Sequence, residues 1–198
     1  EGHFPWERVV AGLYPTSADV STIALLCIAR LAWNPSTVLS IDMNDWCAPY
    51  DDRRMWIYSR KARSGGAYQH GVCEAKNPSG PYSVLRRLIE RSQPLRDWIE
   101  NHQDEHPTPR SALRSPFVGV NLRQGYPLFV ADPEGDSTVR NRLRSFIAEH
   151  NARPGAVQVR AMTPSDFRDV AAAVMFSDSR YSMWVKQVLL GHASQRST

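Results

Sequence analysis

The stretch from 163 to 194, TPSDFRDVAAAVMFSDSRYSMWVKQVLLGHAS, decides the fold. Thr163 and Pro164 form a helix start signal, because a polar residue followed by proline suits the entry to the first helical turn. The apolar residues after it recur at i, i+3, i+4, i+7 and i+8, namely Phe167, Val170, Ala171, Val174 and Met175. This spacing predicts a helix whose apolar stripe faces a core. A second helix follows with Tyr181, Val185, Val188 and Leu189 inward, and Gly191 ends it.

Two more helices are predicted near the beginning of the chain. Thr16 and Asp19 have the spacing of a capping box, which marks a helix start. The apolar residues that follow at helical spacing are Val20, Ile23, Cys27 and Leu31. Asn34 and Pro35 then restart the chain as a short helix, since asparagine is a good N-cap and proline suits the first helical position.

In the middle of the chain the residue pattern changes from one typical of helices to one typical of β-strands. A strand is predicted over 55–58 and another over 67–73, with a hairpin turn at 64–66 between them. A small antiparallel sheet of two or three strands follows from this pattern. Helical spacing resumes at Val84, and Pro94 is expected to separate a short continuation from the main helix.

Residues 102–135 are rich in proline, glycine and polar residues and have the least regular pattern, with apolar pieces at 117–122 and 126–130. Asp136 or Ser137 then caps a helix, with Arg140 and Arg144 partly outward. Its inward residues are Val139, Leu143, Phe146 and Ile147. We therefore predict an arm or linker stub over 1–15 and one mainly α domain of the α+β class over 16–198.

Composition limits the kinds of protein that this chain can be. With 42% hydrophobic and 22% charged residues among 198, it can bury a core, which excludes wholesale disorder. The longest apolar run, 23–33, is too short and too charged to span a bilayer, and no secretory signal opens the chain. Cys27, Cys47 and Cys73 lack CxxC spacing and predict reduced thiols in a cytoplasmic protein. The net charge of +4, carried mostly by arginine, favours a polyanionic partner.

The C-terminal stretch resembles the end of the tyrosine recombinase (phage integrase) family. In that family a His-x-x-Arg pair opens a helix and a Leu-Gly-His follows later, so Arg168 and His192 match the arginine and the histidine. Residues 24–46 resemble the family's earlier block, with Asp45 near its acidic position. The family's hairpin lysine then falls on Lys61. The resemblance covers about 25–198.

This resemblance implies a protein that breaks and rejoins double-stranded DNA through a 3′-phosphotyrosine, as in integration or recombination of a mobile element. It implies that Arg168 binds the scissile phosphate, that Lys61 acts as general acid and that His192 donates a hydrogen bond to the phosphate. Arginine suits the charge of a phosphorane, and the covalent link conserves the bond energy, so no cofactor is expected. Family members act as tetramers on DNA, usually with an N-terminal domain that closes a clamp. We therefore expect this protein to form a homo-oligomer or to act with a hetero-partner recombinase. The expected location is the bacterial cytoplasm or nucleoid.

The sequence departs from the family pattern at three positions. Asn34 occupies the place of the first arginine, Ser165 that of the His-x-x-Arg histidine, and Asp169 that of a residue that is often histidine. The nucleophilic tyrosine is expected nine residues after His192, three beyond Thr198. Arg30, one turn before Asn34, is a hypothetical substitute for the missing arginine. The alternative function is a degenerate recombinase that binds DNA, or a partner subunit, without cutting.

Each candidate residue also has a purely structural interpretation. Asn34 is a natural N-cap, Ser165 a first-turn helix residue and Arg168 a solvated one. His192 after a glycine would complement a helix dipole. Lys61 would belong to a solvated hairpin, although the arginines beside it form a plausible contact with the DNA backbone, namely Arg53, Arg54, Arg60 and Arg63.

One competing motif runs from His102 to His106, which matches the H-x-x-E-H pattern of inverted zinc proteases. Two histidines four residues apart bind a metal only when they share one face of a continuous helix. Pro107 directly follows and disfavours helical geometry at His106. We therefore expect a polar loop here and no metal site.

Overall fold

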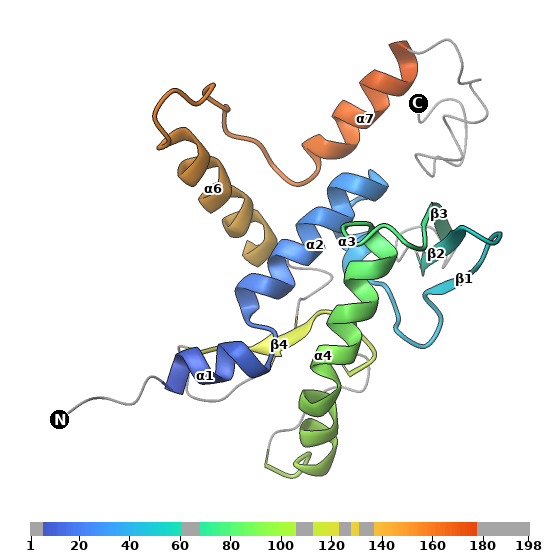
Figure 1. Cartoon of the computed structure of the whole chain (residues 1–198), viewed down its shortest axis with the longest axis vertical. Helices are drawn as coiled ribbons and strands as arrows, with labels where there is room; N and C mark the ends of the chain where they lie inside the picture. The colour runs from blue at the N-terminus through green and yellow to red at the C-terminus, as the bar shows by residue number, and fades with distance from the viewer. Residues whose placement is uncertain (1–5, 61–67, 106–112, 123–127, 131–136, 178–198) are drawn as a thin grey trace.

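The computed structural model describes residues 6–60, 68–105, 113–122, 128–130 and 137–177. Within them, helix α2 (Ser17–Leu31) lies at the centre of the molecule (Figure 1). It packs against α3 (Pro35–Leu39), α4 (Pro81–Asn101), α6 (Ser137–Asn151) and α7 (Asp166–Ser177). No helix in this part of the chain has the length and the apolar composition needed to cross a membrane.

Helix α2 begins at the predicted capping box. The Thr16 hydroxyl accepts from the Asp19 backbone N–H at 3.2 Å, and the Asp19 carboxylate accepts from the Thr16 N–H at 2.8 Å. The helix ends at Ala32, whose φ of 53° places it in the left-handed region. Its core-facing side is fully buried at Val20, Ala24, Cys27 and Ile28. This face is the centre of the main hydrophobic core.

The predicted small sheet is present and has three antiparallel strands in the order β1 (Cys47–Pro49), β2 (Arg54–Arg60) and β3 (Tyr68–Glu74). Its inner face packs on the end of α2: Ile57 is fully buried, and Gly71 lies against Trp33. A Cβ on Gly71 would stand 3.3 Å from Leu31 Cδ2 and 3.4 Å from the Trp33 ring, so a larger residue would require only a small shift of the Leu31 side chain. The hairpin turn predicted at 64–66 lies outside the described residues.

Two segments that the sequence pattern assigned no regular structure contain some. The predicted arm or linker stub over 1–15 holds helix α1 (Trp6–Leu13), in which Trp6, Val9, Val10 and Leu13 recur at i, i+3, i+4 and i+7, a helical period that the prediction overlooked. The apolar pieces within 102–135 supply β4 (Val118–Val120) and β5 (Leu128–Val130), which pair antiparallel. Thr16 forms a bridge to Val120 and so ties this second sheet to the start of α2.

Helix α4 contradicts the prediction that Pro94 separates it into two pieces, because it runs unbroken from Pro81 to Asn101. Proline removes one backbone hydrogen bond and crowds the preceding turn. Side-chain donors act in the same turn: the Ser92 hydroxyl donates to Leu88 O at 2.6 Å, and Arg96 donates to Ile89 O at 3.3 Å. Leu88 before Pro94 and Leu95 and Ile99 after it are all buried, so tertiary packing of the whole helix outweighs the local cost of proline.

Helix α6 agrees with its prediction: Val139 and Leu143 are buried, and Arg140 and Arg144 are exposed. Helix α7 begins at Asp166, just after the predicted start signal, and Phe167 packs against the core. The predicted apolar stripe is wrong at Val170 and Val174, which are 57% and 61% exposed. The helix predicted from Tyr181 to Leu189 lies outside the described residues.

Candidate active site

The loop between α2 and α3 carries Asn34, the residue in place of the family's first arginine. Its backbone carbonyl accepts the first helical hydrogen bonds of α3, and Pro35 occupies the first helical position. Its side chain makes no capping hydrogen bond. The structural interpretation of Asn34 as an N-cap therefore holds for the backbone and leaves the amide for another contact.

The first turn of α7 carries Arg168 and is fixed by its own start signals. The Asp166 carboxylate accepts from the Thr163 N–H at 2.7 Å, and Ser165 O accepts from the Arg168 N–H at 2.9 Å. Ser165 and Asp169 are exposed, whereas Arg168 is half-buried against the rest of the molecule. The helix start therefore directs Arg168 toward the end of α2.

Arg168 and Asn34 meet although 134 residues separate them. The Arg168 Nη1 donates to the Asn34 amide oxygen at 3.3 Å. Figure 1 shows α7 crossing beside the C-terminal end of α2, where Asn34 follows. Two of the residues that the family resemblance nominated as site residues thus share one location, at the C-terminal end of α2.

Arg30, the proposed substitute cation, lies in the last turn of α2 and is exposed. Among the described residues its guanidinium has no hydrogen bond or ion pair. It is separated from Asn34 by the left-handed turn at Ala32, which redirects the chain between them. Arg30 and the Asn34–Arg168 pair thus both lie at the C-terminal end of α2, on either side of this turn.

The three-stranded sheet is joined to this site by one buried contact that sequence reasoning missed. The Ser59 hydroxyl on β2 donates to Thr37 O on α3, three residues after Asn34. Ser59 directly precedes Arg60 and Lys61 in the chain. A serine in a β-prone run gives no sequence signal for such a role, because its acceptor is a backbone carbonyl 22 residues away.

The remaining nominated residues divide into two groups. Arg53, Arg54 and Arg60 are exposed around the ends of β2. Lys61, Arg63 and His192 lie outside the described residues, so their predicted roles stay predictions.

The H-x-x-E-H motif does not lie on a helix over the part that the structure describes. Helix α4 ends at Asn101, and residues 102–105 form a turn. The Nδ1 of His102 lies 2.8 Å from the Trp98 carbonyl oxygen, and its ring stacks on Trp98. His106 lies outside the described residues. Across the described ranges no group of three or more potential ligands is arranged to hold a metal ion.

A mainly helical domain with a small three-stranded antiparallel sheet, arranged in this order, is a tyrosine-recombinase-like catalytic fold, which confirms the predicted fold class. Solved structures with this fold include XerH site-specific recombinase bound to difH substrate in a pre-cleavage complex, with a TM-score of 0.58 and 13% sequence identity. That alignment covers 91% of this chain and 42% of the recombinase chain.

A second neighbour is XerH bound to a palindromic difH substrate in a post-cleavage complex, with a TM-score of 0.53 and 12% identity. It covers 91% of this chain and 41% of that one, so the present chain spans about two-fifths of the length of these neighbours. No protein-family model and no curated protein matches the sequence. The structural likeness, at this identity, establishes the fold.

Proposed function

We propose that this protein binds double-stranded DNA and breaks and rejoins its strands as a site-specific recombinase. The observation that carries the proposal is the hydrogen bond between Arg168 and Asn34, because it gathers two nominated site residues from opposite ends of the chain. The fold shared with DNA-bound recombinases supports it. The mild basic charge and the exposed Arg140 and Arg144 on α6 are consistent with a phosphate-rich partner.

Arg168 would bind the nonbridging oxygens of the scissile phosphate, where planar N–H donors stabilise the charge of a pentavalent phosphorane. In this reaction a tyrosine hydroxyl gives up its proton to a base, its oxygen attacks phosphorus, and the bond from phosphorus to the 5′-oxygen breaks. Lys61 would give the departing 5′-oxygen its proton, and His192 would donate to the phosphate. Ser165, at the entrance to α7, would offer a weaker hydrogen bond in place of the family's histidine. Rejoining reverses these steps, so neither ATP nor a metal is required.

Asn34 would act as a positioning residue in this scheme. Its amide oxygen takes one N–H of Arg168 and restricts the orientation of the guanidinium, which is otherwise carried on a long side chain. An amide cannot replace the charge of the family's first arginine. Arg30, exposed on the same end of α2, is the cation proposed to supply it.

The presence of Asn34 in place of the family's first arginine also favours a second candidate function. Removal of one phosphate-stabilising donor typically costs on the order of 10² to 10³ in rate, and a neutral Asn34 removes a full charge. A DNA-binding partner subunit that does not cleave would tolerate this loss. The two functions differ in whether a covalent protein–DNA adduct forms.

The test is an adduct assay with the natural full-length protein, its C-terminal sequence first established by intact mass, on duplexes selected from a random pool by binding. We expect Arg168→Ala to lower adduct formation by on the order of 10² to 10³, and Asn34→Ala to lower it by about tenfold, because only orientation is lost. Arg153→Ala, an exposed arginine after α6, is the matched control and should cleave normally. DNA binding without any adduct would establish the non-cleaving alternative.

A second substrate isolates the proposed role of Lys61. A 5′-bridging phosphorothiolate has a thiolate leaving group, which needs no proton from a general acid. Lys61→Ala should therefore cleave this substrate at nearly the wild-type rate while losing on the order of 10² on ordinary DNA. Arg168→Ala should stay impaired on both, since the phosphorane charge is unchanged. Equal impairment of Lys61→Ala on both substrates would refute the general-acid assignment.

A further inference from the structure

The last cross-strand pair of β2 and β3 joins Arg60 to Tyr68, directly opposite each other in the register. The Arg60 Nε donates to the Tyr68 hydroxyl oxygen at 3.0 Å, and the guanidinium lies 5.2 Å from the centre of the Tyr68 ring. The Tyr68 hydroxyl in turn donates to the Asp45 carboxylate at 3.0 Å. Three side chains from two strands and a turn therefore form one connected chain of hydrogen bonds.

This arrangement holds Arg60 without neutralising it directly. The Tyr68 hydroxyl is uncharged, and its hydrogen bond raises the pKa of Arg60. Among the residues that the structure describes, Arg60 donates through its Nε alone, so within this part of the chain the two terminal amino groups of the planar guanidinium keep their donors. The nearby Asp42 carboxylate is paired with Arg114, which leaves Asp45 as the acidic group behind Tyr68. The Arg60 side chain is thus a fixed cation with its fork exposed.

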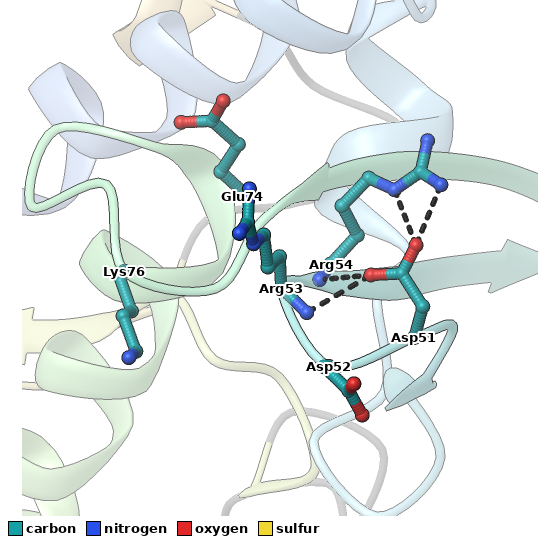
Figure 2. Close-up of a pocket in the computed structure, with 6 residues that line it drawn as sticks. All are labelled: Asp51, Asp52, Arg53, Arg54, Glu74 and Lys76. Atoms are coloured by element: carbon teal, nitrogen blue, oxygen red, sulfur yellow. Dashed lines mark hydrogen bonds and ion pairs between the residues drawn. The ribbon is translucent and has the colours of Figure 1, made fainter.

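The opposite end of β2 provides the contrast. Arg54 places both its Nε and its Nη2 on one Asp51 oxygen, at 2.7 and 2.5 Å, as Figure 2 shows. Arg54 lowers the pKa of Asp51, so the pair stays ionised and mutually neutralised. The cavity of about 750 Å³ at this end is lined by the carboxylates of Asp51, Asp52 and Glu74 as well as by Arg53, Arg54 and Lys76. Its balanced charges give it no preference for an anion.

We propose that Arg60 binds a phosphate of the DNA backbone beside the candidate active site, with Tyr68 as its positioning residue and Asp45 as the anchor of Tyr68. This inference rests on the proposed DNA-binding function and specifies which arginine of the sheet performs it. Ser59, next to Arg60, is bonded to α3, so the fork keeps a fixed relation to Asn34. A phosphate held there would set the distance between the bound duplex and Arg168.

The experiment measures duplex affinity of the full-length protein over a series of salt concentrations. Each phosphate contact contributes about 0.9 to the slope of log affinity against log salt. Arg60→Ala should weaken binding about tenfold at low salt and reduce the slope by about 0.9. Arg86→Ala is the matched control, because Arg86 also lies over a tyrosine ring but is paired with Glu90. It should keep both the affinity and the slope.

Tyr68→Phe separates positioning from simple structural support, because it keeps the ring and removes the hydroxyl. We expect a three- to fivefold loss of affinity with the slope unchanged, since Arg60 still reaches the phosphate but is no longer held (about 1 kcal/mol per hydrogen bond corresponds to such a change). In the Arg60→Ala background the same substitution should have no further effect. A structural role would instead give additive losses and a lower unfolding midpoint.

The outcomes distinguish this inference from the function on which it rests. No duplex binding by the wild-type protein at low salt would overturn the proposed function itself. Normal wild-type binding with an unchanged slope in Arg60→Ala would overturn only the assignment of Arg60. Arg54→Ala, which breaks a neutral pair, should change the slope by less than half as much as Arg60→Ala; an equal change would also count against the proposal. Circular dichroism of every variant checks that each one is folded.

Discussion

The ionisation of Cys27 is controlled by the position of this residue at the buried centre of α2. Its thiol is fully buried, and burial raises its pKa far above the ordinary value of 9.0, while the neighbouring Cys73 adds a smaller effect in the same direction. Burial likewise raises the pKa values of Cys47 and Cys73. A thiol that cannot ionise in the folded protein is a poor nucleophile and a poor metal ligand, so this cysteine serves packing.

The raised pKa of Cys27 makes a pH-dependent contribution to stability. Below pH 9 the thiol is neutral in both the folded and the unfolded state, so the contribution is fully present. Above it the unfolded chain ionises first and binds fewer protons, and stability falls as pH rises. Between pH 7 and pH 10 the wild-type protein should lose about 1.4 kcal/mol more than Cys27→Ala.

The measurement is urea unfolding of the two proteins at pH 7, 8, 9 and 10. Because Cys47 and Cys73 are present in both, their titration cancels in the comparison. Desolvation lowers the pKa of Arg96 to about 10, and because Arg96 is also present in both proteins, its deprotonation cancels in the same way. Parallel pH profiles for the two proteins would mean that Cys27 ionises in the folded state.

At the scale of elements, α4 depends on Arg96 for its attachment to the second sheet. This guanidinium is 1% exposed and has carbonyl and hydroxyl acceptors in place of a carboxylate. It donates to Leu113 O at 3.2 Å, Ser115 O at 2.7 Å and Ser92 Oγ at 2.5 Å. The segment before β4 is thereby fixed against the half of α4 that follows Pro94.

Replacement of Arg96 by methionine should lower the free energy of unfolding by about 2–4 kcal/mol, because two buried carbonyl oxygens lose their donors. The matched control is Arg91→Met on the exposed face of the same helix, where a change within about 0.5 kcal/mol is expected. Chemical denaturation followed by circular dichroism measures both. If Arg96→Met were as stable as the wild type, the guanidinium would not be what holds this segment to α4.

The prediction that Pro94 breaks the helix failed because it took no account of buried side chains such as Arg96. Local rules describe the backbone cost of proline correctly. They contain no term for a side chain in the next turn, such as Arg96, that becomes buried when the helix packs in the folded protein. The capping box at Thr16 and Asp19 succeeded because both of its hydrogen bonds are local. Elements whose decisive contacts lie within four residues are therefore the ones that the sequence predicts well.

At the scale of the whole molecule, the fold class was predictable but the site's geometry was not. The order of helices and hairpin, together with the resemblance, indicated the correct architecture and nominated Asn34 and Arg168. The hydrogen bond between them depends on how α7 docks on α2, which no local pattern encodes. The link from Tyr68 to Asp45 was missed for a similar reason, since it joins a strand to a turn 23 residues away.

The contact between Asn34 and Arg168 also has a consequence for how the protein matures. Closing a segment of 134 residues costs chain entropy, and contacts of such long range form late in folding. A nascent chain that has not yet emerged as far as α7 has no Arg168 guanidinium beside Asn34. Formation of the Asn34–Arg168 contact therefore reports that synthesis has passed α7 and that this helix has docked. Under the proposed function, a chain in which α7 has not yet emerged lacks the Arg168 guanidinium that would bind the phosphate.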